Sequence, residues 1–449
     1  MKKSERFGTA SITQLLIEQS VPASIGILVM SLNIIVDTIF VGRFIGPLGI
    51  GAITVVMPIV FLISSVGMAQ GIGGSSVFSR ALGSRDTEKS SSVLGNMISC
   101  TIILSFCFVS LGFAFDESII TLFGGKGELM APSATYFRIL LYGVSFLAWA
   151  MMSNPLIRAL GYPKLAMLTL IIPSILNVIL DPIFIIVLDM GIAGAGWASS
   201  LSYLGSGLYT AIFIFSGKSD ISISWKHLKP KIDIIREMFA IGSVTLARQG
   251  TISLLVIVLN NSLFIYGAET AVSVYGIASR CMMFALFPVM GITQGFLPVA
   301  GYNYGARHWD RVRLSIRLSM GYATLMAGII FTMIMLFTPQ IIGVFTTDQS
   351  LIDQTVPAMR CLFLATPLIG INLIGSGYYQ AIGRAIPALL LALTKQGFFL
   401  IPLILLLPIH FGLNGIWYAF PVADLGAAIV TYLYMKRDDR SEYKKMAVA

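Results

Sequence analysis

The chain has 449 residues, of which 56% are hydrophobic and only 11% are charged, and its mean hydropathy is +0.86. Soluble domains carry about 25% charged residues, so this composition excludes an ordinary soluble protein and indicates an integral membrane protein. The formal net charge of +9 fits a nucleic-acid partner in principle, but the placement of the basic residues gives another explanation.

The N-terminal residues MKKSERFGTASITQ are polar and basic, and the first apolar run after them is long enough to span a bilayer. We therefore expect no cleavable signal peptide. The four cysteines lie in apolar runs without a CxxC pair, and the three histidines are scattered. Disulfides, a zinc or haem centre and a resident cofactor are therefore not expected.

Twelve apolar runs are long enough to cross a bilayer as helices, which predicts an all-α integral membrane protein. They cover roughly residues 14–41, 50–78, 91–114, 131–154, 165–188, 192–216, 237–266, 270–302, 314–336, 354–379, 386–407 and 412–435. An even number of spans places both termini on one side of the membrane. That side collects 23 of the 30 Lys and Arg residues, whereas the other side has only Arg43 and Lys126. The positive-inside rule then predicts two cytoplasmic termini, and the basic charge requires no nucleic acid.

The first span carries an acid, Asp37, deep within its apolar sequence. Pro22 precedes it by about four turns of helix. This proline is a candidate kink that would divide the span into two segments able to move apart. Alternatively, it lies close enough to the helix start to be tolerated without a bend.

The fifth span carries Ser174, Asn177 and Asp181 at spacing i, i+3, i+7, which places them on one helical face. Pro182 removes a backbone N–H, so the helix should bend there and leave a carbonyl free. A carboxylate at bilayer depth costs about 2.5–3.5 kcal/mol. Asp181 must therefore meet an ion, a water-filled cavity or a partner on a neighbouring helix.

Ser199 opens the sixth span after a short turn, so it can fold back toward Asp181; alternatively, it is a helix-packing serine. Together, Asp37, Asn177, Asp181 and Ser199 would supply two carboxylates and two neutral oxygens. Hard cations such as Na⁺ prefer oxygen ligands of this kind. Two close carboxylates can instead share one proton, and the sequence leaves both uses open.

The longest polar interval, residues 216–237, separates two sets of six spans. It divides the chain into an N-terminal six-helix bundle (1–216), a cytoplasmic linker (217–236) and a C-terminal six-helix bundle (237–449). Internal similarity supports this division: MAQGIGGSSVFSRALGSRD (68–86) resembles ITQGFLPVAGYNYGARHWD (292–310), and GIAGAGWA (191–198) resembles GLNGIWYA (412–419). Six spans in each half make the two repeats parallel.

The two halves differ in their embedded acids. The repeat offset places Asn260 or Asn261 opposite Asp37, and an apolar stretch, 402–405, opposite Asp181. This asymmetry predicts a single ion or proton site, in the N-terminal bundle. In the C-terminal bundle, a buried polar network is expected from Arg280, Lys395 and Asp424. We favour a structural role for that network over a second coupling site.

The motifs VDTIFVGR, GMAQGIGGSSVFSRALGSRD, NVILDPIFI, ITQGFLPVAGYNYGAR and FPVAD, on a 6+6 plan, resemble the multidrug and toxic compound extrusion (MATE) family. The resemblance covers essentially the whole chain and is greatest to the DinF-like and MepA-like branch. It implies the MATE/MOP fold and export of organic cations and amphiphilic drugs driven by inward H⁺ or Na⁺. It also implies a cation site at Asp37, Asn177, Asp181 and Ser199, and a bend at Pro22.

We therefore expect a secondary active multidrug efflux transporter that works by alternating access. It would be a multi-pass monomer, surrounded by lipid, in the cytoplasmic (inner) membrane of a prokaryote. The alternative is a flippase of lipid-linked sugars or lipids from the same superfamily. Such a flippase is expected to carry more basic residues along its cleft. In this chain the deepest charges of the N-terminal bundle, Asp37 and Asp181, are acidic, which favours cationic substrates. An enzyme is not expected, because no HExxH motif, metal cluster or nucleophile–base spacing is present.

Overall fold

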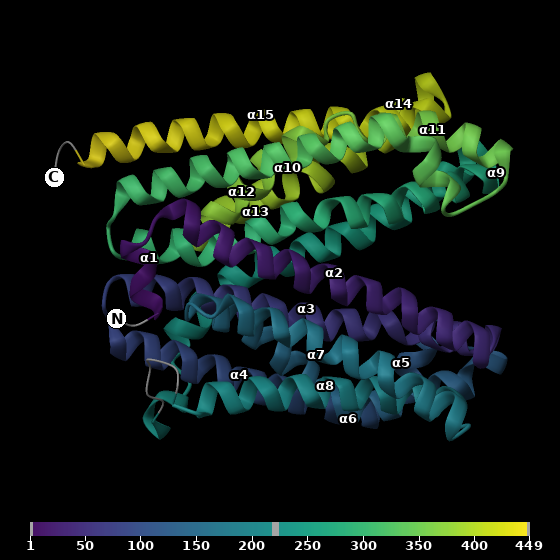
Figure 1. Ribbon diagram of the computed structural model, residues 1–449, viewed down its shortest axis with the longest axis horizontal. Coiled ribbons are helices and arrows are strands. Elements are labelled where there is room, and N and C mark those ends of the chain that lie inside the picture. The colour runs from purple at the N-terminus through teal and green to yellow at the C-terminus, as the bar shows by residue number, and fades with distance from the viewer. Residues whose placement is uncertain (1–2, 218–223, 447–449) are drawn as a thin grey trace. The chain divides into compact units, whose positions relative to one another are not determined.

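The computed structural model describes residues 3–217 and 224–446, with side chains to residue 438. Within these residues every regular element is a helix, which confirms the predicted all-α class (Figure 1). Residues 218–223, in the predicted linker 217–236, lie outside the described residues.

Each of the first six predicted spans corresponds to one long helix or helical pair, and the predicted spans 165–188 and 192–216 extend one residue past the observed helix end. These long elements are α2 (Ile12–Phe44), α3 (Pro47–Gly83), α4 (Thr87–Ala114), α6 (Met130–Ala159), α7 (Pro163–Asp181) with the π-helical segment η3 (Pro182–Val187), and α8 (Gly191–Phe215). The shorter elements of this half are η1 (Lys3–Glu5), α1 (Arg6–Thr9), α5 (Asp116–Leu122) and η2 (Gly127–Leu129). The short helix α5 was not predicted from the sequence.

The second half is more often interrupted. Its elements are η4 (Trp225–Leu228), α9 (Ile232–Gly305), α10 (Trp309–Gly343), α11 (Gln349–Phe363), η5 (Thr366–Leu368), α12 (Ile369–Ala381), α13 (Ala385–Leu393), the π-helical segment η6 (Thr394–Leu400), α14 (Ile401–Phe411) and α15 (Leu413–Met446). The predicted tenth span therefore comprises α11, η5 and α12, and the eleventh comprises α13, η6 and α14.

Among the described residues, eleven helical stretches are long and apolar enough to cross a membrane. One of them, α9, contains a non-helical residue, Ala268, with φ 52° and ψ −156°. This break lies between the predicted seventh and eighth spans, so α9 supplies both. The prediction of twelve spanning helices is therefore confirmed.

The internal repeat extends to the backbone conformation. Left-handed residues end helices or turn the chain at an offset of 221 or 222 residues, in the pairs Gly46 and Ala268, Arg85 and Arg307, Gly161 and Gly383, and Gly191 and Gly412. The hydrogen bonds around them match as well. After α3, Asp86 N donates to Ala81 O at 2.9 Å, and after α9, His308 N donates to Asn303 O at 2.9 Å. The two halves thus share the turns that set where their helices stop.

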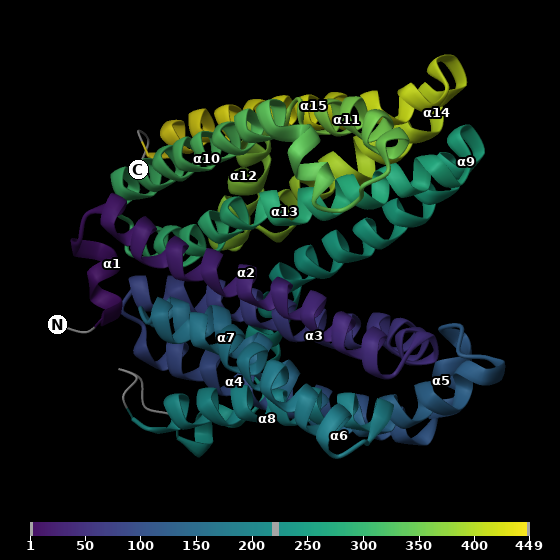
Figure 2. The same cartoon turned by 45° about the vertical axis from the view of Figure 1, so that its right-hand side comes forward.

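The chain forms two compact units. The first comprises the residues up to Ser11, Ile25–Thr245 and Gly301–His308. In it, α6 packs against α3, α4, α7 and α8. Figures 1 and 2 both show these helices running side by side. The predicted bundle boundaries at residues 216 and 237 stay a prediction.

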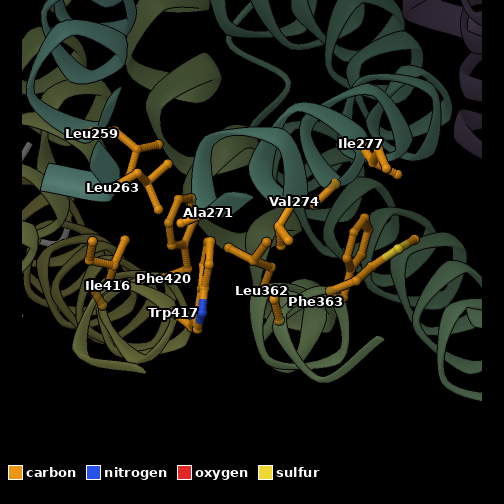
Figure 3. Packing of buried hydrophobic residues seen from close by; sticks show 14 of the residues in the cluster. Leu259, Leu263, Ala271, Val274, Ile277, Leu362, Phe363, Ile416, Trp417 and Phe420 are labelled. Carbon is orange, nitrogen blue, oxygen red and sulfur yellow. The ribbon is translucent and has the colours of Figure 1, made fainter. Parts of the chain in front are cut away.

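The second unit comprises Ile12–Ser24, Leu246–Ala300 and the chain from Trp309 onward. Its core is a continuous cluster of buried apolar side chains. Figure 3 shows Trp417 and Phe420 of α15 packed in one cluster with Leu263 of α9 and Leu362 of α11. A fully buried core residue typically touches about 6–12 others, so this cluster packs α9, α11 and α15 against one another.

Close backbone crossings in the first unit depend on glycine. A Cβ added to Gly83 would lie 2.0 Å from the carbonyl oxygen of Tyr302, and one added to Gly305 would lie 2.1 Å from that of Arg80. Both obstacles are backbone atoms, which cannot turn aside as a flexible side chain can. The end of α3 and the end of α9 therefore approach each other through two glycines that are themselves repeat equivalents.

We expect Gly83→Ala to destabilise the protein by about 1–3 kcal/mol, because the added methyl group must push the two helices apart. The midpoint of thermal unfolding in detergent should fall accordingly. Gly321→Ala in α10 is the matched control, because a Cβ there meets nothing within 4 Å. An equal effect of the two substitutions would contradict this account of the crossing.

Candidate functional site

The structure brings the three predicted residues of α2 and α7 together in the first unit. Asp37 lies on α2, and Asn177 and Asp181 lie on the last turns of α7. All three side chains are buried, with exposed fractions of 9%, 4% and 0%. The carboxyl groups of Asp37 and Asp181 lie within hydrogen-bonding reach of each other.

A chain of side-chain hydrogen bonds leads to this carboxyl pair. Asn33 of α2 donates through Nδ2 to Oδ1 of Asn177 at 3.0 Å. Asn177 in turn donates through Nδ2 to Oδ1 of Asp181 at 3.2 Å. Asn33 stands four residues before Asp37, so the two occupy the same face of α2. The site therefore has two links from α2 to α7, one through amides and one through carboxyls.

Within the described part of the chain, the carboxyl pair has neither a basic partner nor a full set of hydrogen-bond donors. Among the described residues, no Lys, Arg or His forms an ion pair with Asp37 or Asp181, and Oδ1 of Asp37, Oδ2 of Asp181 and Oδ1 of Asn33 are buried without a hydrogen-bond donor. Two negative charges about 4 Å apart repel by about 4 kcal/mol at an effective dielectric constant of 20. Because nothing basic offsets that repulsion, the geometry suits a shared proton or a cation between the carboxyl groups.

Ser199 of α8 reaches the pair through an intermediate. Its hydroxyl group bonds with the hydroxyl of Tyr136 of α6, which interacts electrostatically with both Asp37 and Asp181. Tyr203, one turn after Ser199 on α8, interacts with both carboxyl groups as well. No direct hydrogen bond joins Ser199 to either acid in the described part of the chain. Ser174 points to its own helix, where it donates to Leu170 O at 2.8 Å.

Three residues of this site were absent from the sequence analysis: Asn33, Tyr136 and Tyr203. The i, i+4 spacing of Asn33 and Asp37, and of Ser199 and Tyr203, is a signal that could have found two of them. Tyr136 lies on the fourth span and has no such local signal, since only the packing of α6 against α8 brings it to the carboxyl pair.

The two proline positions differ in their surroundings. At Pro182, α7 gives way to the π-helical segment η3, so the winding of the helix changes directly after Asp181. By contrast, α2 continues as one helix through Pro22. The helix is divided between the two compact units: its residues up to Ser24 belong to the second unit, and those from Ile25, three residues after the proline, belong to the first. Bends at Pro22 and Pro182 stay predictions.

In the second unit, two of the three residues of the predicted polar network meet. Lys395 of η6 and Asp424 of α15 form an ion pair of 2.5 Å, with side chains that are 16% and 3% exposed. Arg280 is exposed, and it has no ion pair or hydrogen bond within the described residues. The structure thus reduces the network to a pair.

Arg138, another basic residue within a predicted span, has an acidic partner. It binds Asp116 of the short helix α5. The hydrogen bond from the Arg138 guanidinium group holds the pKa of the Asp116 carboxyl below its usual value. Arg138 is therefore neutralised outside the carboxyl site.

Comparison with known proteins agrees with this architecture. The MatE family model matches residues 22–183 and 244–406, two segments whose starts are 222 residues apart. The multidrug export protein MepA of Staphylococcus aureus (strain N315) is 28% identical over 440 residues, which cover 96% of each chain. A crystal structure of a MATE in the straight conformation superposes with a TM-score of 0.92 at 26% identity, over 99% of this chain and 100% of that one. A structure of a MATE in the bent conformation gives 0.92 at 26% identity and covers 100% of both.

These matches extend over both repeats, and the helices they cover are long and apolar enough to span a membrane. The chain is therefore a multi-pass membrane protein that belongs to the MatE family, the MATE transporters.

Proposed function

We propose that this transporter exports organic cations or amphiphilic drugs in exchange for inward H⁺ or Na⁺. The observation that carries the proposal is the contact between the buried Asp37 and Asp181 carboxyl groups, which have no basic partner among the residues that the structure describes. The name of the relative MepA, a multidrug export protein, supports the drug part of the proposal. In this proposal no resident cofactor takes part, and the ion gradient supplies the energy for transport.

The coupling follows from the electrostatics of the site. A proton or Na⁺ entering between the two carboxyl groups removes their mutual repulsion and draws α2 and α7 together. Exchange requires that the ion and the drug stabilise different conformations, because a ligand shifts an equilibrium only by its differential affinity for the two states. We propose that the ion-bound state releases the drug and that α2 changes shape at Pro22 between the states.

We further propose that the protein acts as a monomer in the cytoplasmic (inner) membrane of a prokaryote, with both termini in the cytoplasm. The excess of Lys and Arg on the side of the termini supports this orientation. Drug would then leave the cell as the ion enters.

The test is efflux of a fluorescent cationic dye from proteoliposomes in which a pH gradient and a Na⁺ gradient are imposed separately. We expect at least one gradient to drive dye movement against its concentration, and an ionophore that collapses that gradient to stop it. Dye movement that neither gradient drives would contradict cation-coupled export. In that case, flipping of a lipid-linked sugar in the same vesicles would identify the flippase alternative.

A further inference from the structure

We propose that Asn33 is a specificity-determining residue that lowers the affinity of the Asp37–Asp181 site for Na⁺. The inference rests on the proposed function, because it takes this site to be the coupling site. It assigns to Asn33 an action through Asn177, one of the two neutral residues of the predicted ligand set.

The orientation of the Asn177 side chain is the first step. A side-chain amide has an acceptor at one end and a donor at the other. Asn177 gives its NH₂ group to Asp181 at 3.2 Å and presents its oxygen to Asn33 at 3.0 Å. The Asn177 oxygen therefore faces away from the carboxyl pair. Only this oxygen, and not the NH₂ group, could coordinate a hard cation such as Na⁺.

Sodium binding at Asp181 with Asn177 as a ligand thus requires the amide to turn over. If Asn177 turns alone, its NH₂ group meets the NH₂ group of Asn33, and the hydrogen bond between them is lost. If Asn33 turns as well, the bond is kept, but its NH₂ group moves to the position of its own Oδ1. That position is buried and has no hydrogen-bond partner among the described residues. The first movement costs about one buried hydrogen bond, and the second leaves a buried NH₂ group unpaired where a carbonyl oxygen was unpaired before.

A proton makes no such demand. It can bind directly between the carboxyl oxygens that lack donors, Oδ1 of Asp37 and Oδ2 of Asp181, while both amides keep their orientation. Asn33 therefore discriminates against Na⁺ without touching the ion. A purely structural role, in which Asn33 only ties α2 to α7, makes the opposite prediction, because loosening that tie would weaken the binding of any cation.

The test measures Na⁺ affinity of the purified full-length protein at constant pH and ionic strength, with Na⁺ replacing K⁺. The readouts are the Na⁺-dependent rise of the thermal unfolding midpoint and calorimetric titration. Asn33→Leu leaves the Asn177 oxygen without a partner, so we expect Na⁺ affinity to rise by roughly 3- to 10-fold. Asn33→Asp, which only accepts when ionised, should raise it further.

A second pair of variants shows whether the effect passes through Asn177. In an Asn177→Ala background, Asn33→Leu should leave Na⁺ affinity unchanged, because no amide remains to be oriented. Three results would each overturn the proposal. The first is unchanged or weaker Na⁺ binding in Asn33→Leu, and the second is an equal gain from Asn33→Leu in the Asn177→Ala background. The third is no detectable Na⁺ binding by the wild type, Asn33→Leu and Asn33→Asp alike. The proposed function fails separately, if Asp37→Asn and Asp181→Asn both keep full efflux.

Discussion

Asp37→Asn and Asp181→Asn should each nearly abolish gradient-driven drug efflux while the protein still reaches the membrane. Asparagine keeps the size of the side chain but cannot carry the charge that attracts a proton or Na⁺. Coupling free energies of 1–3 kcal/mol correspond to factors of about 5–150, so we expect a loss of efflux toward the upper end of that range. The measurement is the initial rate of dye efflux from proteoliposomes at equal amounts of protein.

Glu269→Gln is the matched control, because it removes an exposed carboxylate from α9 without touching the site. We expect it to transport like the wild type. Full efflux in both Asp37→Asn and Asp181→Asn, with the control also active, would refute the coupling site. A thermal unfolding midpoint close to that of the wild type in each variant would separate lost coupling from lost folding.

Lys395→Met should destabilise the second unit by about 3–5 kcal/mol, the cost of leaving one partner of a buried ion pair alone. Asp424 is 3% exposed on its side chain and has Lys395 at 2.5 Å, so the substitution strands a charge in an apolar core. The thermal unfolding midpoint in detergent is the measurement, and expression should fall with it.

The double variant Lys395→Met, Asp424→Leu restores an uncharged interior and should recover most of the lost stability. If it also transports at the wild-type rate, the pair is structural, as the sequence analysis favours. A stable double variant without efflux would instead make the pair a second coupling site, and the single ion site of the first unit would no longer suffice.

The length and composition of the apolar runs were enough to predict the twelve spans, because an apolar run of about 20 residues is typical of a helix that crosses a bilayer. The break between the seventh and eighth spans was predicted as well, although the structure carries α9 through it with only Ala268 out of helical conformation. The interruptions inside the tenth and eleventh spans were not predicted. The first contains Pro367 and the second contains Lys395, but hydropathy averaged over a whole span does not reveal a 3₁₀ or π turn.

The candidate site divides in the same way. Asp37 and Asp181 stood out in the sequence because a charge within an apolar run is expensive. Asn33 carries no charge and Tyr136 is an ordinary residue of membrane helices, so neither attracted notice. The direction of the Asn177 amide depends on what surrounds it in space, and no spacing rule along a chain gives that direction.

Gene duplication accounts for the matched left-handed residues, such as Arg85 and Arg307, and for the paired glycines Gly83 and Gly305. Both copies have kept the conformations that stop and cross their helices, while the stretch opposite Asp181 has become wholly apolar. The two repeats thus share the backbone positions that shape their helices, whereas the buried acids at Asp37 and Asp181 belong to one repeat alone. A substitution that alters the shared turns should therefore disturb either half alike, but only the first half can lose its carboxyl pair.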